Sequence, residues 1–127
     1  MKVKMKVMIV EDEDLIRKTL QRALILRQHL VETSSNGFDG VQLYNVFKPD
    51  LVLLDLLMPV KNGFEFMAEA KPICPIIIMT AYSGDSIENF NSIDYPNVIG
   101  IIKKPFAKLE ELLLKIEELY AHHIRKI

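Results

Sequence analysis

The sequence has a single cysteine, Cys74, so it cannot form an intramolecular disulfide. Its apolar sequence neighbours favour a buried, inert thiol over a nucleophile. No apolar run approaches the roughly 20 residues that a membrane-spanning helix needs. The first residues turn acidic too soon for a secretory signal peptide. We therefore expect a soluble protein of a reducing compartment, the cytoplasm.

An excess of one charge is also lacking, because 16 lysines and arginines stand against 17 aspartates and glutamates. A net charge of −1 predicts neither direct nucleic-acid binding nor attachment to a membrane. Half of the 127 residues are hydrophobic, which is enough for the core of one domain. No repeat, linker or low-complexity tract divides the chain. We expect one domain over residues 1–127, with no separate output domain.

Short apolar runs, several of them rich in valine and isoleucine, predict β-strands. Their near-continuous apolar character is typical of parallel strands that are covered on both faces. The predicted strands lie at residues 7–10, 29–34, 51–55, 75–80 and 98–102.

Helical patterns alternate with these strands. The alternation predicts an α/β fold, a doubly wound five-stranded parallel sheet with right-handed crossovers. The predicted helices lie near residues 16–24, 37–48, 62–71, 85–92 and 109–120.

Polar side chains stand at the carboxyl ends of four predicted strands, where ligands bind in an open parallel sheet. Clustered carboxylates repel one another unless a cation holds them together. Mg²⁺ is a hard cation that prefers oxygen ligands, so it suits this set. With a lysine and a hydroxyl it would complete a site for a phosphoryl group. The residues are Glu11 and Asp12, Asp55, Thr80, and the pair Lys103 and Lys104.

Each of these residues has a simpler explanation when it is taken alone. An acidic run favours a helix N-terminus, Asp55 could serve a turn, Thr80 is a β-former, and a lysine is usually a solvated charge. Their joint placement at four strand ends favours a common site.

Four segments resemble the response-regulator receiver domain of two-component signalling, and together they extend along essentially the whole chain. They are "MIVEDEDLIR", "PDLVLLDLLMPVKNGFE", "PIIIMTA" and "IIKKPF". The D-x-x-M-P-x-x-x-G spacing in the second segment is the most specific of these signals. The resemblance implies a flavodoxin-like fold with strand order 2-1-3-4-5.

The resemblance also implies how the acidic residues act. Asp55 would accept a phosphoryl group from a phosphohistidine of a sensor histidine kinase or a histidine phosphotransfer protein. Asp12, Asp55 and the backbone carbonyl of Leu57 would bind Mg²⁺ directly, and Glu11 would act on the metal through water. Such a protein catalyses only its own phosphoryl transfer and dephosphorylation, so we do not expect an enzyme.

The remaining implied roles concern switching. Thr80 would donate its hydroxyl to a phosphoryl oxygen, and Lys104, which directly precedes proline in a cis peptide bond, would pair with the phosphate. Ile101 stands where the family usually has an aromatic ring that moves with the threonine, so the usual switch is in question. Leu57 and Tyr82 would flank the phosphoryl group. Leu57 cannot bind an attacking water, so we expect slow self-dephosphorylation.

Other functional classes fit less well. A haloacid-dehalogenase-type phosphatase needs an acid two positions after its nucleophile, where this chain has Leu57. A flavodoxin-like electron carrier needs a phosphate-binding loop after the first strand, where the acidic run would repel phosphate. The alternative that stays open is a phosphorylation-independent pseudo-receiver. The complete site argues against it, and the missing aromatic at Ile101 argues for it.

We expect the protein to pass on its signal by docking to a downstream protein target. The family uses the face formed by the fourth helix, the fifth strand and the fifth helix. Apolar residues widen the surface of the final helix beyond one stripe, which fits either core packing or a partner surface, including a homodimer. These residues are Leu114, Leu119, Ile124 and Ile127.

Overall fold

The structure of the chain is a computed structural model, which describes residues 3–81, 94–106 and 108–126. The helix predicted at 85–92 and the residues Tyr82 and Ile127 lie outside the described residues. The elements are β1 (Lys6–Val10), α1 (Asp14–Leu26), β2 (Leu30–Ser34), α2 (Gly37–Phe47), β3 (Leu51–Leu54), α3 (Gly63–Ala70), β4 (Ile76–Thr80), β5 (Val98–Lys103) and α5 (Leu109–Arg125).

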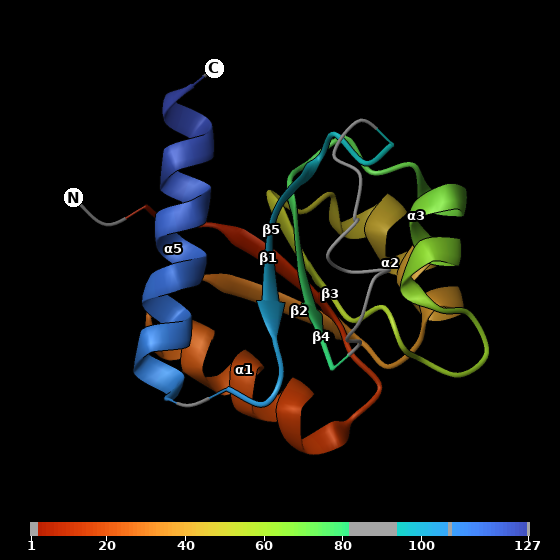
Figure 1. The fold of residues 1–127 in the computed structure, drawn as a ribbon, viewed down its shortest axis with the longest axis horizontal. Coiled ribbons are helices and arrows are strands. Elements are labelled where there is room, and N and C mark those ends of the chain that lie inside the picture. Colours follow the sequence, from red (N-terminus) through yellow and green to blue (C-terminus); the bar gives the residue numbers. More distant parts are fainter. Residues whose placement is uncertain (1–2, 82–93, 107, 127) are drawn as a thin grey trace.

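The strands form one parallel sheet in the order β2-β1-β3-β4-β5, which confirms the predicted fold (Figure 1). The register aligns the strand ends, because Val10 lies opposite Ser34 on one side and Leu54 on the other. At the far side of the sheet Thr80 lies opposite Lys103. Residues that follow β1, β3, β4 and β5 therefore meet at a single edge.

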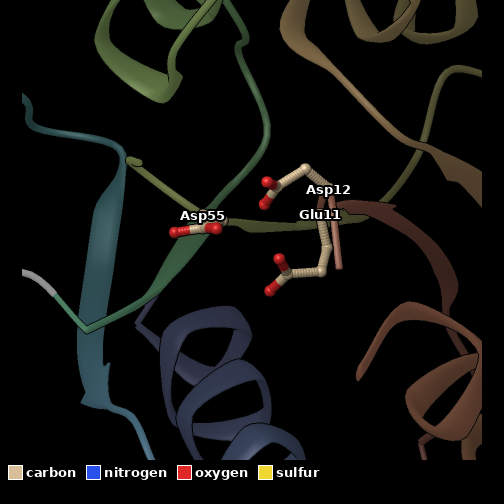
Figure 2. Close-up of side chains that lie close together, drawn as sticks. All are labelled: Glu11, Asp12 and Asp55. Carbon is tan, nitrogen blue, oxygen red and sulfur yellow. The ribbon is translucent and has the colours of Figure 1, made fainter. Parts of the chain in front are cut away.

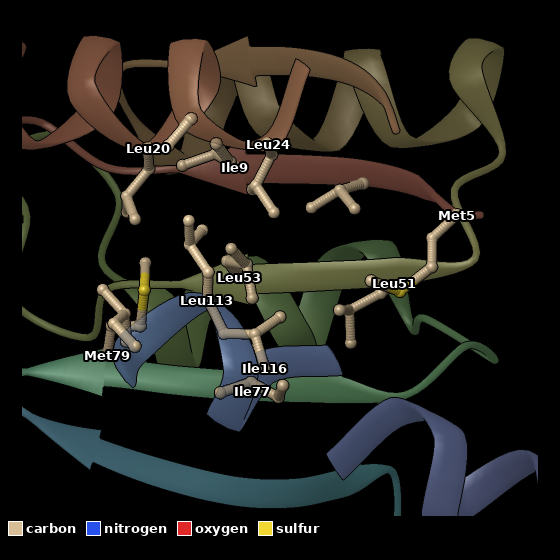
Figure 3. Close-up of a cluster of buried hydrophobic side chains, with 13 residues drawn as sticks. Met5, Ile9, Leu20, Leu24, Leu51, Leu53, Ile77, Met79, Leu113 and Ile116 are labelled. Carbon is tan, nitrogen blue, oxygen red and sulfur yellow. The ribbon is translucent and has the colours of Figure 1, made fainter. Parts of the chain in front are cut away.

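Helices cover both faces of the sheet, with α1 and α5 on one face and α2 and α3 on the other (Figure 1). All residues of β3 and β4 are buried, which explains why their sequences are apolar without interruption. Figure 3 shows the core under α1 and α5, whose members include Ile9, Leu20, Leu24, Leu53, Ile77, Leu113 and Ile116. None of the helices in the described part of the chain combines the length and apolar composition needed to cross a bilayer.

Asparagine side chains begin the two helices on the other face. The Asn36 side chain accepts a hydrogen bond of 2.8 Å from the backbone N–H of Asp39. Asn62 and Glu65 form a reciprocal capping box at the start of α3. These caps fix where α2 and α3 begin, close to the starts that the sequence predicts.

A partly buried cluster of Arg27, His29 and Glu117 joins α5 to the turn between α1 and β2. Glu117 Oε1 accepts a hydrogen bond of 2.9 Å from Arg27 Nε, and its Oε2 lies 2.7 Å from His29 Nε2. His29 Nδ1 accepts the N–H of Met5, so the ring proton lies on Nε2 and is donated to Glu117. Sequence reasoning did not find this cluster, which packs the final helix against the rest of the domain.

We expect Glu117→Gln to lower the free energy of unfolding by about 1–2 kcal/mol at neutral pH. Burial acts to raise the pKa of Glu117, but hydrogen bonds from Arg27 and His29 outweigh it, and the pKa is lowered overall. A lowered pKa stabilises the fold above the ordinary pKa, and this contribution is lost as the pH falls through the lowered value.

Urea unfolding over a pH series measures this effect, with Glu118→Gln, an exposed neighbour on the same helix, as the control. The loss in Glu117→Gln should shrink in acid. A loss of equal size at every pH would contradict the electrostatic explanation.

Candidate functional site

Three carboxylates meet at the carboxyl edge of the sheet (Figure 2). Glu11 and Asp12 follow β1 and Asp55 follows β3, and one oxygen from each lies within 4.8 Å of the others. The backbone holds the two strand ends together, because the N–H of Asp55 donates to the carbonyl of Val10 at 3.0 Å. Glu11 and Asp55 are buried and Asp12 is half-buried. Parallel register brings these carboxylates together although Asp55 lies far from Glu11 and Asp12 in the sequence.

Lys104 lies between two of the carboxylates. Its Nζ forms an ion pair with Glu11 and lies 3.3 Å from Oδ2 of Asp55. The exposed fractions of these side chains are 7% for Lys104, 0% for Glu11 and 4% for Asp55, so the three charges are almost removed from water. The backbone N–H of Lys104 donates to the carbonyl of Thr80 at 2.9 Å, and the bond from Lys104 to Pro105 is cis, as the resemblance implies.

The other site candidates lie on the neighbouring segments. Thr80 is fully buried at the end of β4. The backbone N–H of Leu57 donates to Oδ1 of Asp55 at 3.1 Å, and the residue Leu57 is 47% exposed. Ile101, on β5, lies opposite Ile78 of β4 and packs against the core under α2 and α3. Ile101 therefore fills apolar space beside the strand that ends at Thr80.

Burial dominates the electrostatics of the site. It raises the pKa of Glu11 to about 7, although the hydrogen bond from Lys104 works against it. Burial also raises the pKa of Asp55, again opposed by the charge of Lys104. Burial acts to lower the pKa of Lys104, but hydrogen bonding and charge from Glu11 and Asp55 outweigh it and raise the pKa. The single ammonium of Lys104 thus partly balances the charge of two buried carboxylates, and Asp12 lies beside them.

The donor set fits a hard divalent cation. Carboxylate oxygens are the ligands that Mg²⁺ and Ca²⁺ prefer, and Mg²⁺ needs few protein ligands because it keeps several waters. A divalent charge would relieve the repulsion among three carboxylates that a single ammonium only partly balances.

A five-stranded parallel sheet in this order, with carboxylates and a lysine gathered at its carboxyl edge, defines the receiver class of signalling modules. The sequence matches the family model of the response regulator receiver domain over residues 7–117. The chain therefore belongs to this family, whose members act as switches in two-component signalling.

Known proteins agree with this assignment. The chain is 33% identical over 119 residues to the probable transcriptional regulator ycf29 of Porphyra purpurea, a match that covers 88% of this chain and 54% of that protein. It is 29% identical to the chemotaxis protein CheY of Halobacterium salinarum, covering 81% of this chain and 87% of that one. The chain thus spans about half the length of the first relative.

A solved structure confirms the fold. The CheY-like response regulator receiver domain protein of Methanospirillum hungatei superposes with a TM-score of 0.84 at 23% identity. The match covers 98% of this chain and all of the other. At this identity the likeness concerns the fold alone.

Sequence reasoning missed one residue near the site, Arg17. Its side chain reaches the loop that carries Glu11 and Asp12. The available signal was an arginine in the first turns of the helix that follows the acidic run.

Proposed function

We propose that the chain is a phosphorylation-dependent switch in which Asp55 accepts a phosphoryl group in the presence of Mg²⁺. The observation that carries this proposal is the buried Asp55 carboxylate, 3.3 Å from the Lys104 ammonium and grouped with two further carboxylates. Burying like charges together costs free energy, and an aspartate with a purely structural role would not require it.

In the proposed step an oxygen of Asp55 attacks phosphorus while the bond from phosphorus to the donor's imidazole nitrogen breaks. The bonding pair stays on that nitrogen, which takes up a proton. Asp12, Asp55 and the carbonyl of Leu57 would hold Mg²⁺, which neutralises phosphoryl charge when bound, and Glu11 would bind a metal water. Lys104 stabilises the negative charge of the transferring group.

Two further residues are assigned by the same proposal. Thr80, buried at the end of β4, donates its hydroxyl to a phosphoryl oxygen. Ile101 takes the place of the usual aromatic and responds by repacking rather than by a ring movement.

Incubation of the protein with Mg²⁺ and acetyl phosphate tests the proposal by intact mass. We expect a gain of one phosphoryl group that a chelator of divalent cations prevents, because the carboxylates then repel the phosphoryl oxygens. Asp55→Asn should show no gain, whereas the matched control Asp94→Asn, which alters an exposed aspartate away from the carboxyl edge, should gain the phosphoryl group like the wild type. No gain that depends on Asp55 would favour the pseudo-receiver.

The same experiment measures the lifetime of the acyl phosphate. Leu57 offers no polar group to orient a water molecule, which supports slow self-dephosphorylation. A lifetime of seconds or less on the isolated domain would rule this out.

The partners follow from the same proposal. A sensor histidine kinase or a histidine phosphotransfer protein in the cytoplasm supplies the phosphoryl group, and a downstream protein reads the face that includes β5 and α5. On α5, Leu119 packs against the core, which supports the packing interpretation, whereas Leu114 is 45% exposed and is available to a target or to a second copy.

A further inference from the structure

Arg17 binds the backbone of both residues that open the acidic loop. Its Nη1 donates to the carbonyl oxygen of Glu11 at 2.9 Å and lies 3.4 Å from that of Asp12. Its Nη2 forms an ion pair with Asp14. The Arg17 side chain is only 12% exposed, so the guanidinium is packed against the protein rather than extended into solvent.

The loop between β1 and α1 has few other restraints. Glu13, the residue at the N-cap of α1, makes no side-chain capping hydrogen bond. The starts of α2 and α3, by contrast, are each held by an asparagine cap. Besides the contacts of the Arg17 side chain, the described contacts of this loop include a hydrogen bond from Glu11 N–H to Ser34, one from Glu13 N–H to Glu11 Oε2, one from Arg17 N–H to the Glu13 carbonyl, and the ion pair of Glu11 with Lys104, and none of these binds the carbonyl of Glu11 or Asp12. Arg17 therefore supplies the contact that a cap supplies elsewhere.

Holding these two carbonyl groups orients the carboxylates. The peptide group is planar, so fixing a carbonyl oxygen fixes the plane that follows each residue and limits the direction of its side chain. A guanidinium does this better than an ammonium, because its donors lie in a rigid plane. The contacts go to backbone oxygens, so Arg17 itself does not occupy the carboxylates of Glu11 and Asp12.

We propose that Arg17 is a positioning residue that holds the loop of Glu11 and Asp12 in the geometry that binds Mg²⁺. This inference rests on the proposed Mg²⁺-dependent function. The change in Mg²⁺ affinity that it predicts has the opposite sign to that of a simple charge effect. Removing a positive charge near the site would by itself strengthen cation binding, whereas loss of positioning weakens it.

Calorimetric titration of the full chain with Mg²⁺ tests the proposal. We expect Arg17→Gln to weaken binding by about tenfold or more, as is usual when a residue that orients metal ligands is removed. Arg22→Gln removes the same charge from an exposed position on the same helix and should leave the affinity unchanged or slightly stronger. Arg17→Lys keeps the charge without the planar fork and should bind more weakly than the wild type.

The outcomes separate this inference from the function on which it rests. If the wild type binds no Mg²⁺, the proposed function fails. If the wild type binds Mg²⁺ and Arg17→Gln binds it equally or more tightly, the positioning role is wrong. Full affinity in Arg17→Lys would also overturn it, and this variant decides the matter should Arg17→Gln fail to fold. Amide chemical shifts of Asp12 and Glu13 in the Mg²⁺-free variants should change, while those of α5 should not.

Discussion

Replacing Asp55 by asparagine is expected to abolish phosphorylation and to stabilise the Mg²⁺-free protein. Asparagine has nearly the same shape, and its oxygen can still accept the Leu57 N–H that Oδ1 of Asp55 accepts now. Its amide is not a nucleophile toward phosphorus, so the gain of a phosphoryl group disappears. The fold keeps Lys104 paired with Glu11 and loses one of two neighbouring buried carboxylates.

The gain in stability follows from the sign of the pKa shift. Burial raises the pKa of Asp55, so the folded state resists its ionisation. Stability from such a group is present below its ordinary pKa and is lost as the pH rises through the raised value. Asparagine does not ionise, so the variant avoids this loss. We expect a gain on the order of 1 kcal/mol in the free energy of unfolding above neutral pH, and no gain in acid.

Urea unfolding across a pH series, with and without Mg²⁺, measures this gain. Mg²⁺ should stabilise the wild type, because a ligand that binds only the folded state adds its binding free energy to stability. It should stabilise the variant much less. The Asp94→Asn control should follow the wild type in both respects. A variant that is less stable than the wild type at alkaline pH would contradict our account of the site.

Replacing Gly63 by alanine is expected to damage both the fold and the site. A Cβ at Gly63 would lie 2.6 Å from the backbone oxygen of Asp55 and 2.9 Å from the Cα of Leu56. Both are backbone atoms of the phosphoacceptor segment, so no side chain can turn aside to make room. This contact explains why the glycine of the D-x-x-M-P-x-x-x-G pattern stands where it does.

The expected cost of Gly63→Ala is about 1–3 kcal/mol, as is usual for overpacking. The higher helix propensity of alanine offsets at most about 1 kcal/mol of it. Because the segment must shift at Asp55, we also expect phosphorylation to slow by about tenfold to a hundredfold.

Gly100→Ala is the matched control for this prediction. There the nearest atom to an added Cβ is also 2.6 Å away, but it is the Cδ1 methyl at the end of the Leu119 side chain, which can rotate. We expect Gly100→Ala to cost less stability and to leave the phosphorylation rate unchanged. Urea unfolding and the rate of mass gain from acetyl phosphate measure both variants. Equal effects of the two substitutions on that rate would contradict the steric explanation.

Local pattern was sufficient for most of the secondary structure. The apolar runs at 51–55 and 75–80 are found as β3 and β4, because complete burial leaves a continuous apolar signal. One strand boundary differs from the prediction where a side chain makes a tertiary contact. The second strand was predicted from 29 and begins at Leu30, since His29 is buried in the turn and binds Glu117.

The grouping of the strand-end residues could also be predicted, because a parallel α/β sheet brings all carboxyl ends to one edge. Which of these side chains pair with each other could not be predicted. Sequence reasoning assigned Glu11 to the metal through water, and the structure also pairs it with Lys104. Nothing in the local sequence distinguishes which of two carboxylates an ammonium contacts more closely.

By itself the sequence determined the strand and helix segments that the structure describes, the family and the chemical types of the candidate site residues, since these depend on periodicity and on motifs a few residues long. Tertiary structure alone decided which of those residues touch. Lys104 meets Glu11 across 93 positions of sequence, and Arg27 meets Glu117 across 90. Contacts over such separations depend on strand register and helix packing, which are set by the whole core, and no short segment encodes them.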